Sequence, residues 1–441
     1  MMRSGLKYSL KYPLAASALA GLAGCATVTQ TPPAPVPAPV PALATDNVAD
    51  ASLDFGVRLM DTVRVQADDS DETVLLSPVS LSTAFGLLYV GSEGDTQAQI
   101  RDVMGFGSET DAFATELGGL ATAVERDTVE PYADGRRTIV DINNAVFLDR
   151  SLNYTPGYLD RIDAAYDATL ESVSFLTDLT GAVDAINDWV NTATRGLIPK
   201  VYGYKDLTTL TSDVLVNTIY MKAAWPGELD ETTGPFRATG GTRDVPRVAD
   251  RGDYAYLDRD GYRALLIPFS DRELAAVAVL PDRDLDRVAA RLDGAGLADL
   301  LDDLETQPNE ARTFVDLELP KLALTGSYKM RDPLLEMGMT VPFDSDLSDF
   351  DGRLDPDLQS RRNAMGFVVG NVTHKTRLDL DEIGVEAAAV TAIDSVIVTG
   401  SRIRVKPVEF HVDRPFLFLL IHRPTGAPLF LARVTDPGEV D

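Results

Sequence analysis

Four side chains in this sequence could act as a general base or a soft nucleophile, and they are few and far apart. They are three histidines and one cysteine, His374, His411, His422 and Cys25. A serine hydrolase needs a histidine beside its serine as general base, and the chain contains no Gly-x-Ser-x-Gly motif. His411 and His422 lie within strand patterns and are interpreted as ordinary strand residues. These residues therefore predict that the chain is not an enzyme.

The residue spacing also gives little support for a metal-binding or phosphate-binding site. No His/Cys cluster with the spacing of zinc ligands occurs. The acidic stretch Asp344–Asp351 lacks the Gly at position six and the Glu at position twelve of an EF-hand loop, so a solvated acidic loop is the better interpretation. No glycine-rich phosphate loop is present. We expect neither a metal nor a cofactor.

The segment 385–400 has the composition of a β-strand without a visible partner strand. Residues two apart share one face of a strand. From Val385 to Val396 the odd positions carry no charge, whereas Glu386 and Asp394 both fall on the even face. One face could therefore be buried without removing a charge from water. The run that begins at Glu386, Glu-Ala-Ala-Ala, also favours a helix, so an Ala-rich helix or a linker remains an alternative on this pattern alone.

The elements that must position this segment are a mixture of helices and strands. Ser77-Pro78 begins a buried helix over 79–90. Asp95 or Thr96 caps the next helix, which ends at Gly105, and a Leu-spaced helix covers 284–304. Strands are predicted over the ranges 210–221, 274–280, 313–319 and 416–421, and another begins near Val408. Helices and strands do not alternate in βαβ units, which favours an α+β fold.

Six segments, in order along the chain, together resemble the serpin family. They correspond to the serpin helix B region, the helix F region, the central strand of the large sheet, the proximal hinge and two closing strands. In this sequence they are 74–100, 186–200, 215–225, 374–391, 413–418 and 429–434. The resemblance implies a serpin domain over 45–441, with a large central mixed sheet, two further sheets, eight or nine helices and an exposed reactive-centre loop over about 382–406.

The resemblance also implies a buried polar network beneath the large sheet. His374 resembles the serpin shutter histidine, and Ser77, Ser80 and Asn217 occupy matching shutter positions. Trp225, after the central strand, matches the breach tryptophan. We interpret the four shutter residues as a switch network and not as catalytic groups. A few unrelated polar groups in the core remain the alternative.

The resemblance implies suicide inhibition of serine proteases, in which the protease cuts the loop, becomes trapped as an acyl-enzyme, and the loop joins the large sheet as a new strand. Serpin loop insertion is an established example of strand addition. The hinge positions in this sequence are Glu382, Gly384, Val385, Glu386, Ala387, Ala388, Ala389, Val390 and Thr391. Inhibitory serpins usually carry Thr or Ser where this chain has Val385, and a polar residue where it has Ile383. Valine suits burial in a sheet, so we expect insertion to survive.

Family spacing places the scissile bond, because the residue attacked is normally the seventeenth when the hinge Glu382 is the first. That position is Val398, so the bond is Val398–Thr399. A small aliphatic side chain suits elastase-like or subtilisin-like proteases. Cleavage at Arg402 or Arg404 by trypsin-like proteases is the alternative. The segment from Val385 to Val398 reaches about 46 Å at roughly 3.3 Å per residue, enough to cross a large sheet.

The amino-terminal residues predict export and lipidation. A basic start and a short apolar run precede Leu22-Ala-Gly-Cys25, which resembles a bacterial lipobox, so residues 1–24 are interpreted as a signal peptide and Cys25 as the lipidated residue. Residues 25–44 form a proline-rich tether. Ala26 after the cysteine resembles outer-membrane sorting. We expect a bacterial outer-membrane lipoprotein that faces the periplasm or the cell surface. An ordinary signal peptide cleaved nearby, or an uncleaved anchor, is the alternative.

The charge of the chain limits its partners. The formal net charge is −28, and removal of residues 1–24, which carry three basic and no acidic residues, changes it to −31. This acidity disfavours nucleic acid. Around 124–137, the region that matches the heparin-binding helix of some serpins, acidic and basic residues are mixed. We therefore expect no glycosaminoglycan cofactor and a monomer whose partner is a serine protease. A non-inhibitory serpin that acts as a binding or scaffold protein is the rival interpretation.

Overall fold

The computed structural model describes most of the chain after residue 46. All described residues belong to the unit Pro39–Asp441, and they are 47–66, 72–106, 110–129, 136–353, 368–370, 372–385 and 406–439. The predicted signal peptide, Cys25, the tether and the loop residues 386–405 lie outside the described residues. Among the described helices, none has both the length and the apolar character needed to span a bilayer.

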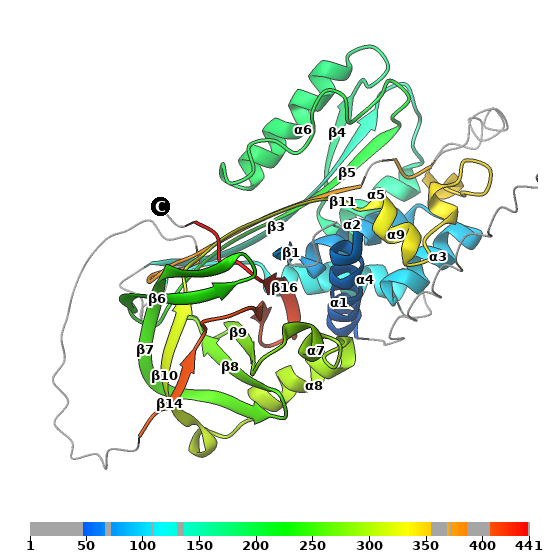
Figure 1. Ribbon diagram of the computed structural model, residues 1–441. Helices are drawn as coiled ribbons and strands as arrows, with labels where there is room; N and C mark the ends of the chain where they lie inside the picture. The colour runs from blue at the N-terminus through cyan, green and yellow to red at the C-terminus, as the bar shows by residue number, and fades with distance from the viewer. Residues whose placement is uncertain are drawn as a thin grey trace, which may run out of the picture. The chain divides into compact units, whose positions relative to one another are not determined.

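The described residues form nine α-helices, most of them in the first half of the chain (Figure 1). Their bounds are α1 Val48–Gln66, α2 Pro78–Val90, α3 Gly94–Met104, α4 Thr110–Val124, α5 Pro156–Tyr166, α6 Leu179–Ala193, α7 Leu285–Ala289, α8 Gly294–Glu305 and α9 Arg331–Glu336. Three short 3₁₀ helices add Asn309–Ala311, Val341–Phe343 and Asp351–Arg353.

A seven-stranded mixed sheet is the large sheet that the sequence predicts. Its order is β11-β12-β13-β5-β3-β2, with β4 paired to β3. The β3–β4 ladder is parallel and the others are antiparallel. Its strands are β2 Arg126–Val129, β3 Arg137–Asp149, β4 Thr169–Val173, β5 Asp213–Ala224, β11 Leu322–Lys329, β12 Thr373–Leu380 and β13 Gly384–Val385.

The two further sheets are continuous with each other through one long strand, β7. In the nine-stranded sheet the order is β1-β16-β15-β9-β8-β7-β10-β14, and β6 also pairs with β7. Residues 255–259 of β7 pair with β8, whereas the rest of β7 pairs with β6 and β10. The strands are β1 Val74–Leu76, β6 Asp230–Ala238, β7 Gly241–Arg259, β8 Tyr262–Pro268, β9 Leu274–Pro281, β10 Thr313–Pro320, β14 Val408–His411, β15 Phe416–His422 and β16 Ala427–Val434.

Helix α2 lies beneath the seven-stranded sheet and is buried on nearly all sides. Ser77 precedes it in an extended conformation and Pro78 occupies its first turn, as expected for a helix start, but the Ser77 side chain makes no capping hydrogen bond. The helix contains no charged residue, and every side chain except that of Ala84 is buried. A helix that is apolar all round is stable only inside a core, so α2 forms the buried layer against which β5 packs.

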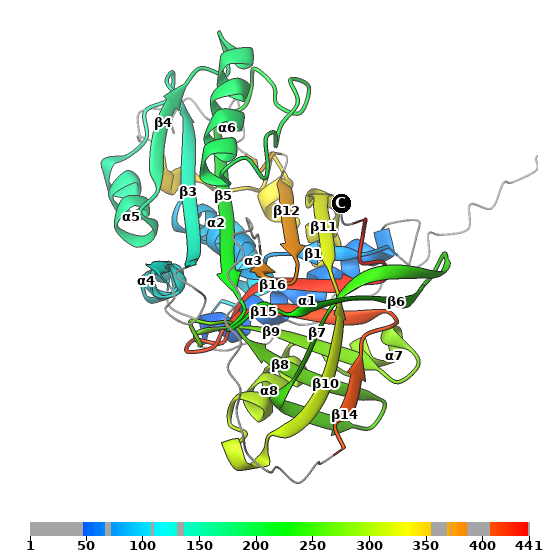
Figure 2. The same cartoon turned by 90° about the vertical axis from the view of Figure 1, so that its left-hand side faces the viewer.

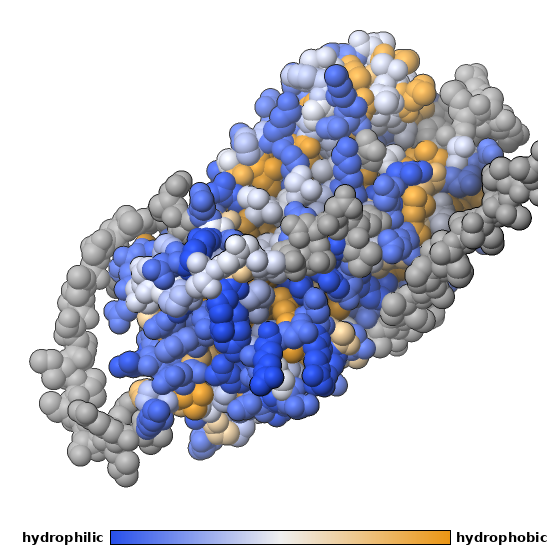
Figure 3. All heavy atoms as spheres, in the orientation of Figure 1, coloured by the Kyte–Doolittle hydropathy of each residue, from blue (hydrophilic) through white to orange (hydrophobic). Residues whose placement is uncertain are grey.

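Helix α6 covers the opposite, outer face of the same sheet (Figure 2). Its apolar side, which includes Val183, Ile186 and Val190, packs on Phe147 of β3 and Val216 of β5 in a separate small core. On the face of the molecule in Figure 3, apolar side chains gather toward α6 and the adjoining strand ends, and hydrophilic side chains dominate over the nine-stranded sheet. The sheet is thus enclosed on both faces where β5 crosses it.

Three expected element boundaries were wrong. The single helix over 284–304 is two helices, because Asp293 caps α8 and Gly294 approaches the backbone of Asp54 too closely to carry a Cβ (2.5 Å to Cα). Glu93, and neither Asp95 nor Thr96, precedes α3. Strand β5 begins at Asp213 and leaves Leu210 86% exposed. The strand expected near Val408 is confirmed as β14.

Candidate functional site

Strand β12 ends in a tight turn, Asp381–Gly384, that brings the chain back into the same sheet. The Asp381 carboxylate Oδ1 accepts hydrogen bonds from the backbone N–H groups of Ile383 (2.8 Å) and Gly384 (3.1 Å). The Asp381 N–H donates to the Gly384 carbonyl at 2.8 Å. Burial raises the pKa of Asp381, and the two backbone donors partly offset that effect. A short side chain that bonds its own backbone in this way is typical of an Asx turn.

Gly384 occupies a position that only glycine fits. Its φ is +149°, and a Cβ built there would lie 2.0 Å from the carbonyl oxygen of Ala223. The close approach exists because Gly384 pairs with Ala224, and Val385 with Ala223, in an antiparallel ladder. The prediction that Gly384 gives the turn its freedom therefore has a specific cause, which is contact with the β5 backbone.

Glu382 is held at the top of the sheet by an ion pair. Its Oε2 lies 2.5 Å from Nζ of Lys321, a residue between β10 and β11 that also contacts Glu231 of β6. Burial alone would raise the pKa of Glu382, but the hydrogen bond from Lys321 holds it below its ordinary value. The side chains of Lys321 and Glu382 are 12% and 21% exposed, so water screens this pair only in part.

Trp225 connects the end of β5 to the same turn. Its ring is fully buried and stacks on Phe269, with centroids 4.4 Å apart and planes 7° from parallel. Its Nε1–H donates to the Asp381 carbonyl at 2.9 Å, and its backbone N–H donates to the Ile383 carbonyl at 2.9 Å. Trp225, Lys321 and the turn Asp381–Val385 form one closely bonded unit, which we call the hinge end.

The hinge end inserts only two residues, Gly384 and Val385, between β5 and β12. Val385 is 3% exposed and pairs with both Ala223 and Leu380. Beyond it, no ladder of the described chain joins β5 to β12. The edge of β5 over 215–221 and the facing edge of β12 over 373–379 therefore lack a strand partner within the described residues. Unpaired edges inside a sheet invite an added strand.

The lower part of this gap, which we call the open end, comprises Leu215–Thr218 on β5 and Thr373–Lys375 on β12. Beneath it, polar groups of α2 and of Ser77, which precedes this helix, are bonded to both strands. The backbone N–H of Ser77 donates to Nε2 of His374 at 3.0 Å, and the hydroxyl of Ser80 donates to Oδ1 of Asn217. Burial lowers the pKa of His374 to about 3, so this ring is neutral and not a general base at ordinary pH.

The geometry differs from the expected four-residue network in two respects. Ser77 contributes its backbone, and its hydroxyl has no partner among the described residues. The second difference is Asn144 of β3, which the sequence analysis missed. Its Oδ1 accepts from Nδ2 of Asn217 at 2.7 Å, and its own Nδ2 donates to the Tyr166 carbonyl at 3.1 Å. The sequence signal that could have identified Asn144 was an amide side chain within a run of buried strand residues.

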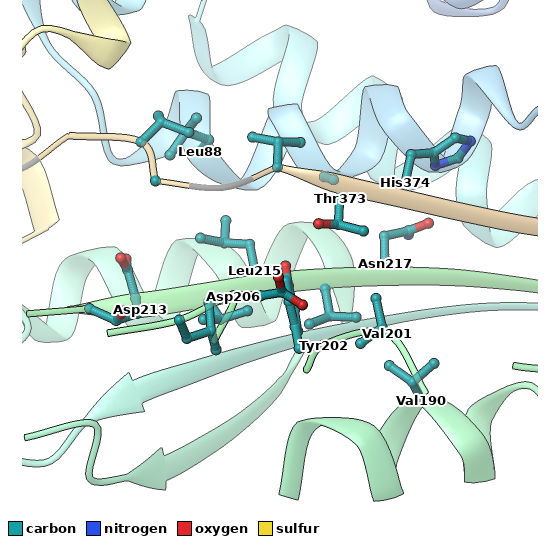
Figure 4. A pocket seen from close by; sticks show the side chains of 18 of the residues that line it. Leu88, Val190, Val201, Tyr202, Asp206, Asp213, Leu215, Asn217, Thr373 and His374 are labelled. Atoms are coloured by element: carbon teal, nitrogen blue, oxygen red, sulfur yellow. The ribbon is translucent and has the colours of Figure 1, made fainter. Parts of the chain in front are cut away.

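A cavity of about 490 Å³ opens at this lower part of the gap (Figure 4). Asn217, Thr373 and His374 lie on its wall, as do apolar groups of α2, α6 and β5, such as Leu88, Val190 and Leu215. The sheet is therefore closed at the hinge end and hollow at the open end.

Comparison with known proteins assigns this architecture to a family. A family model described as Serpin (serine protease inhibitor) matches residues 50–437. The chain belongs to the serpin family. The expected α+β serpin fold is confirmed, with nine helices in the described residues, a large mixed sheet and the further sheets joined through β7. Serpins are protease inhibitors and not enzymes in the catalytic sense.

Serpin relatives with different recorded roles resemble this chain over most of their length. The leukocyte elastase inhibitor of Xenopus laevis is 28% identical over 85% of this chain and 96% of the relative. The plasminogen activator inhibitor 1 of Sus scrofa is 29% identical over 87% and 91%. The solved structure of a thyroxine-binding globulin with thyroxine has a TM-score of 0.74 and 25% identity, and covers 89% of this chain and 99% of that one. The named relatives thus include two inhibitors and a thyroxine-binding globulin.

The structure brings the predicted site residues of this serpin into two groups. Glu382, Gly384, Val385 and Trp225 lie at the hinge end, whereas Ser77, Ser80, Asn217 and His374 lie at the open end. The remaining predicted positions, 386–391, 398, 399, 402 and 404, lie outside the described residues. The sequence analysis did not identify Lys321, because its partner Glu382 is distant in sequence and the two meet only across β11 and β12.

Proposed function

We propose that this serpin inhibits serine proteases by the suicide mechanism, in which the cleaved loop joins the seven-stranded sheet as a strand between β5 and β12. The observation that carries the proposal is β13. Val385 is already paired on both sides and Gly384 is paired with β5, and the edges beyond them have no partner in the described chain. Inserting the rest would add backbone hydrogen bonds and bury apolar surface that the native fold leaves exposed.

The register of β13 supports insertion with the uncharged face of the loop segment toward the core. Each residue after Val385 steps back by one residue on β5 and on β12. Thr391 would then lie opposite Asn217 and His374, both of which point toward α2. Glu386, on the other face, would lie opposite Lys222. The uncharged odd positions therefore meet the core, and the even positions that carry Glu386 and Asp394 meet the outer surface.

For the scissile bond and the target protease, our proposal follows the family spacing. We propose cleavage at Val398–Thr399 by an elastase-like or subtilisin-like protease, with Arg402 or Arg404 and a trypsin-like protease as the alternative. The leukocyte elastase inhibitor among the relatives is in keeping with a small apolar specificity residue. We also propose that lipidated Cys25 and the tether 25–44 display the domain on a bacterial outer membrane.

Incubation with elastase-, subtilisin- and trypsin-like proteases, followed by a denaturing gel, tests the mechanism. We expect a stable adduct larger than either protein, and mass spectrometry of the released peptide should place the cut after Val398. The cleaved serpin should also melt at a higher temperature than the native one. Clean cleavage without an adduct, and without a rise in melting temperature, would reject inhibition.

A matched pair of loop variants tests the register itself. Ala389 would lie on the core face opposite Ile219 and Thr376, and Ala388 on the outer face opposite Tyr220 and Arg377. Ala389→Glu should abolish the adduct and leave cleavage intact, because it buries an unpaired charge. Ala388→Glu should retain the adduct. Equal loss in both variants would contradict this register.

A non-inhibitory binding protein is the second candidate. The solved thyroxine-binding globulin in complex with thyroxine is a relative that carries a ligand, and Val385 departs from the residue usual in inhibitors. The gel separates the two candidates directly, since a carrier would be cut as a substrate and form no adduct.

A further inference from the structure

Helix α6 lies over β5 on the outer face of the seven-stranded sheet (Figure 2), and its two ends are fastened to the sheet in different ways. The connection that follows the helix, residues 194–212, moves with it, because Asn187 of α6 bonds this connection. The Asn187 amide accepts the backbone N–H groups of Val201 (2.8 Å) and Tyr202 (3.0 Å) and donates to the Tyr202 carbonyl (2.9 Å). We call α6 and this connection together the α6 unit.

The amino-terminal end of the α6 unit is held by buried contacts. Asp149, the last residue of β3, is 3% exposed, and its Oδ2 accepts the backbone N–H of Phe175, just before α6, at 2.7 Å. The apolar side of α6 packs on the sheet at the same end. Opening here would expose apolar surface and leave a buried carboxylate without its donor, so it should be rare. The sheet residues of this small core are Ala145, Phe147, Val173, Val214 and Val216.

The carboxyl-terminal end of α6 is held by a solvent-facing contact. Arg195 follows the helix in the left-handed conformation (φ +51°), and its Nη2 lies 2.6 Å from Oδ2 of Asp141 on β3. Its guanidinium group also lies 4.5 Å from the ring centre of Tyr220, the β5 residue that pairs with Asp141. The side chains of Arg195 and Asp141 are 44% and 32% exposed. Such an ion pair is screened by water and contributes little to stability.

The small core under α6 does not reach this end of the sheet. Among the described residues, it includes none of β3 before Ala145 and none of β5 after Val216. A second solvent-facing bond, from Nζ of Lys375 on β12 to the carbonyl of Lys200 at 2.8 Å, fastens the connection on the other side of the gap. The α6 unit therefore bridges the gap between β5 and β12 through weak contacts at one end and is firmly packed at the other.

We propose that the α6 unit is a lid that opens at one end only, with its pivot at Asp149 and the small core and its latch at Arg195. Regions with few buried apolar contacts open locally at low cost, so the end of α6 beyond Val190 should open far more often than the end at Leu179. In the register of the inserted strand, Ala388 would lie opposite Tyr220, on the face toward Arg195.

Release of the latch would thus precede entry of the strand beyond Ala388, and this consequence rests on the proposed function. Arg195 acts through the lid and is a positioning residue. The lid itself is a property of the native fold and can be tested without a protease.

Amide hydrogen exchange of the native full-length protein tests the lid. Arg195→Asn removes the ion pair and the ring contact, and asparagine tolerates the left-handed conformation. We expect exchange over residues 190–196 to become roughly fivefold faster, with exchange over residues 179–184 unchanged. Arg195→Lys keeps the positive charge and should exchange like the wild type. Arg259→Asn is the matched control, because the Arg259–Asp303 pair is comparably exposed (45% and 55%) and joins β7 to α8.

Unchanged exchange over residues 190–196 in Arg195→Asn would overturn the lid, and so would exchange that becomes faster by the same factor along the whole of α6. Faster exchange over the same residues in Arg259→Asn would also overturn it, because the effect would then reflect a general loss of stability and not the release of a latch.

The rate of adduct formation at saturating protease tests the latch and separates it from the proposed function. We expect Arg195→Asn to form the adduct roughly twofold faster or more, whereas Arg195→Lys and Arg259→Asn should keep the wild-type rate. Equal rates in all four proteins would mean that the latch does not control insertion. If the exchange results are as expected but no protease forms an adduct with the wild type, the lid stands and the inhibitory function is wrong.

Discussion

The two ends of the gap between β5 and β12 differ in how many of their polar groups are bonded and in how closely their side chains pack. At the hinge end, Trp225 bonds Asp381 and Ile383, Glu382 is paired with Lys321, and Gly384 touches the β5 backbone. At the open end, the strand edges have no ladder partner in the described chain, and a cavity of about 490 Å³ remains. Protein interiors are normally close-packed, so the hollow is the exception.

The difference shows which part of the large sheet lacks strand pairing and close packing in the native fold. In the proposed mechanism, the hinge end would fix the register of the first inserted residues, and the open end would keep backbone groups and apolar surface available for the residues that follow. Changes at the hinge end should therefore act mainly on the stability of the native protein. Changes at the open end should act on its capacity to accept a strand and, at His374, also on the pH dependence of stability.

The largest effect on stability is expected from Trp225→Ala. The change removes a fully buried ring, its stack on Phe269 and its bond to Asp381, and should cost about 3–5 kcal/mol of unfolding free energy. Urea denaturation of the intact protein measures it. Trp225→Phe keeps the stack and should cost much less, about 1–2 kcal/mol. Similar losses in both variants would mean that the hinge end depends on the hydrogen bond and not on packing.

Gly384→Ala should be next in magnitude. A Cβ would lie 2.0 Å from the Ala223 carbonyl oxygen at a φ of +149°, so we expect a loss of about 2–3 kcal/mol from strain and displacement of the backbone. Gly119 provides the control, because a Cβ there would meet nothing within 4 Å. Gly119→Ala lies within α4 and should be neutral or stabilising. A Gly384→Ala protein as stable as the wild type would contradict the tight approach described here.

His374 gives the open end a pH dependence. Its pKa is lowered to about 3 by burial, against about 6.5 in an unfolded chain. The unfolded state therefore binds the proton first, and stability should fall as the pH falls from about 6.5 toward 3, by at most about 1.4 kcal/mol per pH unit. His374→Gln retains an acceptor for Ser77 and does not titrate, so its stability should vary less with pH. Parallel curves for the two proteins would show that His374 is accessible to protons in the native state.

The ion pair at the hinge end should have the smallest effect. Because Glu382 is 21% exposed, Lys321→Met should cost about 1 kcal/mol or less. The pKa of Glu382 is below its ordinary value, so the stabilisation is present at neutral pH and disappears as the pH falls below about 4. A double-mutant cycle with Glu382→Gln measures the coupling. Coupling unchanged between pH 7 and pH 3 would rule out a charge-dependent pair.

Local patterns in the sequence predicted the elements, and long-range contacts limited the prediction of the site. Alternation in 313–319 gave β10 within a residue, and Ser77-Pro78 gave the start of α2. The break between α7 and α8 was missed because Gly294 is required by contact with Asp54, which lies in another helix. A pattern within one segment carries no information about such a neighbour.

The same reason separates the predicted site residues from those that were missed. Gly384 and Val385 could be assigned from their own positions in the hinge. Lys321 and Asn144 function through partners on other strands, Glu382 and Asn217, and those pairs depend on strand register. The cavity could not be predicted, since it depends on how far β5 and β12 stay apart.

The connection after α6 would impose an order on the proposed strand insertion. Asn187 of α6 holds this connection through Tyr202, and Lys375 of β12 bonds it at Lys200. If the loop inserts as proposed, a strand growing from Val385 meets Lys375 opposite Val390, after residues 386–389 have paired, so it could pause with its upper half paired and its lower half free. Amide exchange with heavy water would detect that half-paired species, because protection would spread along β5 from Ala223 toward Asp213 in two separable kinetic phases.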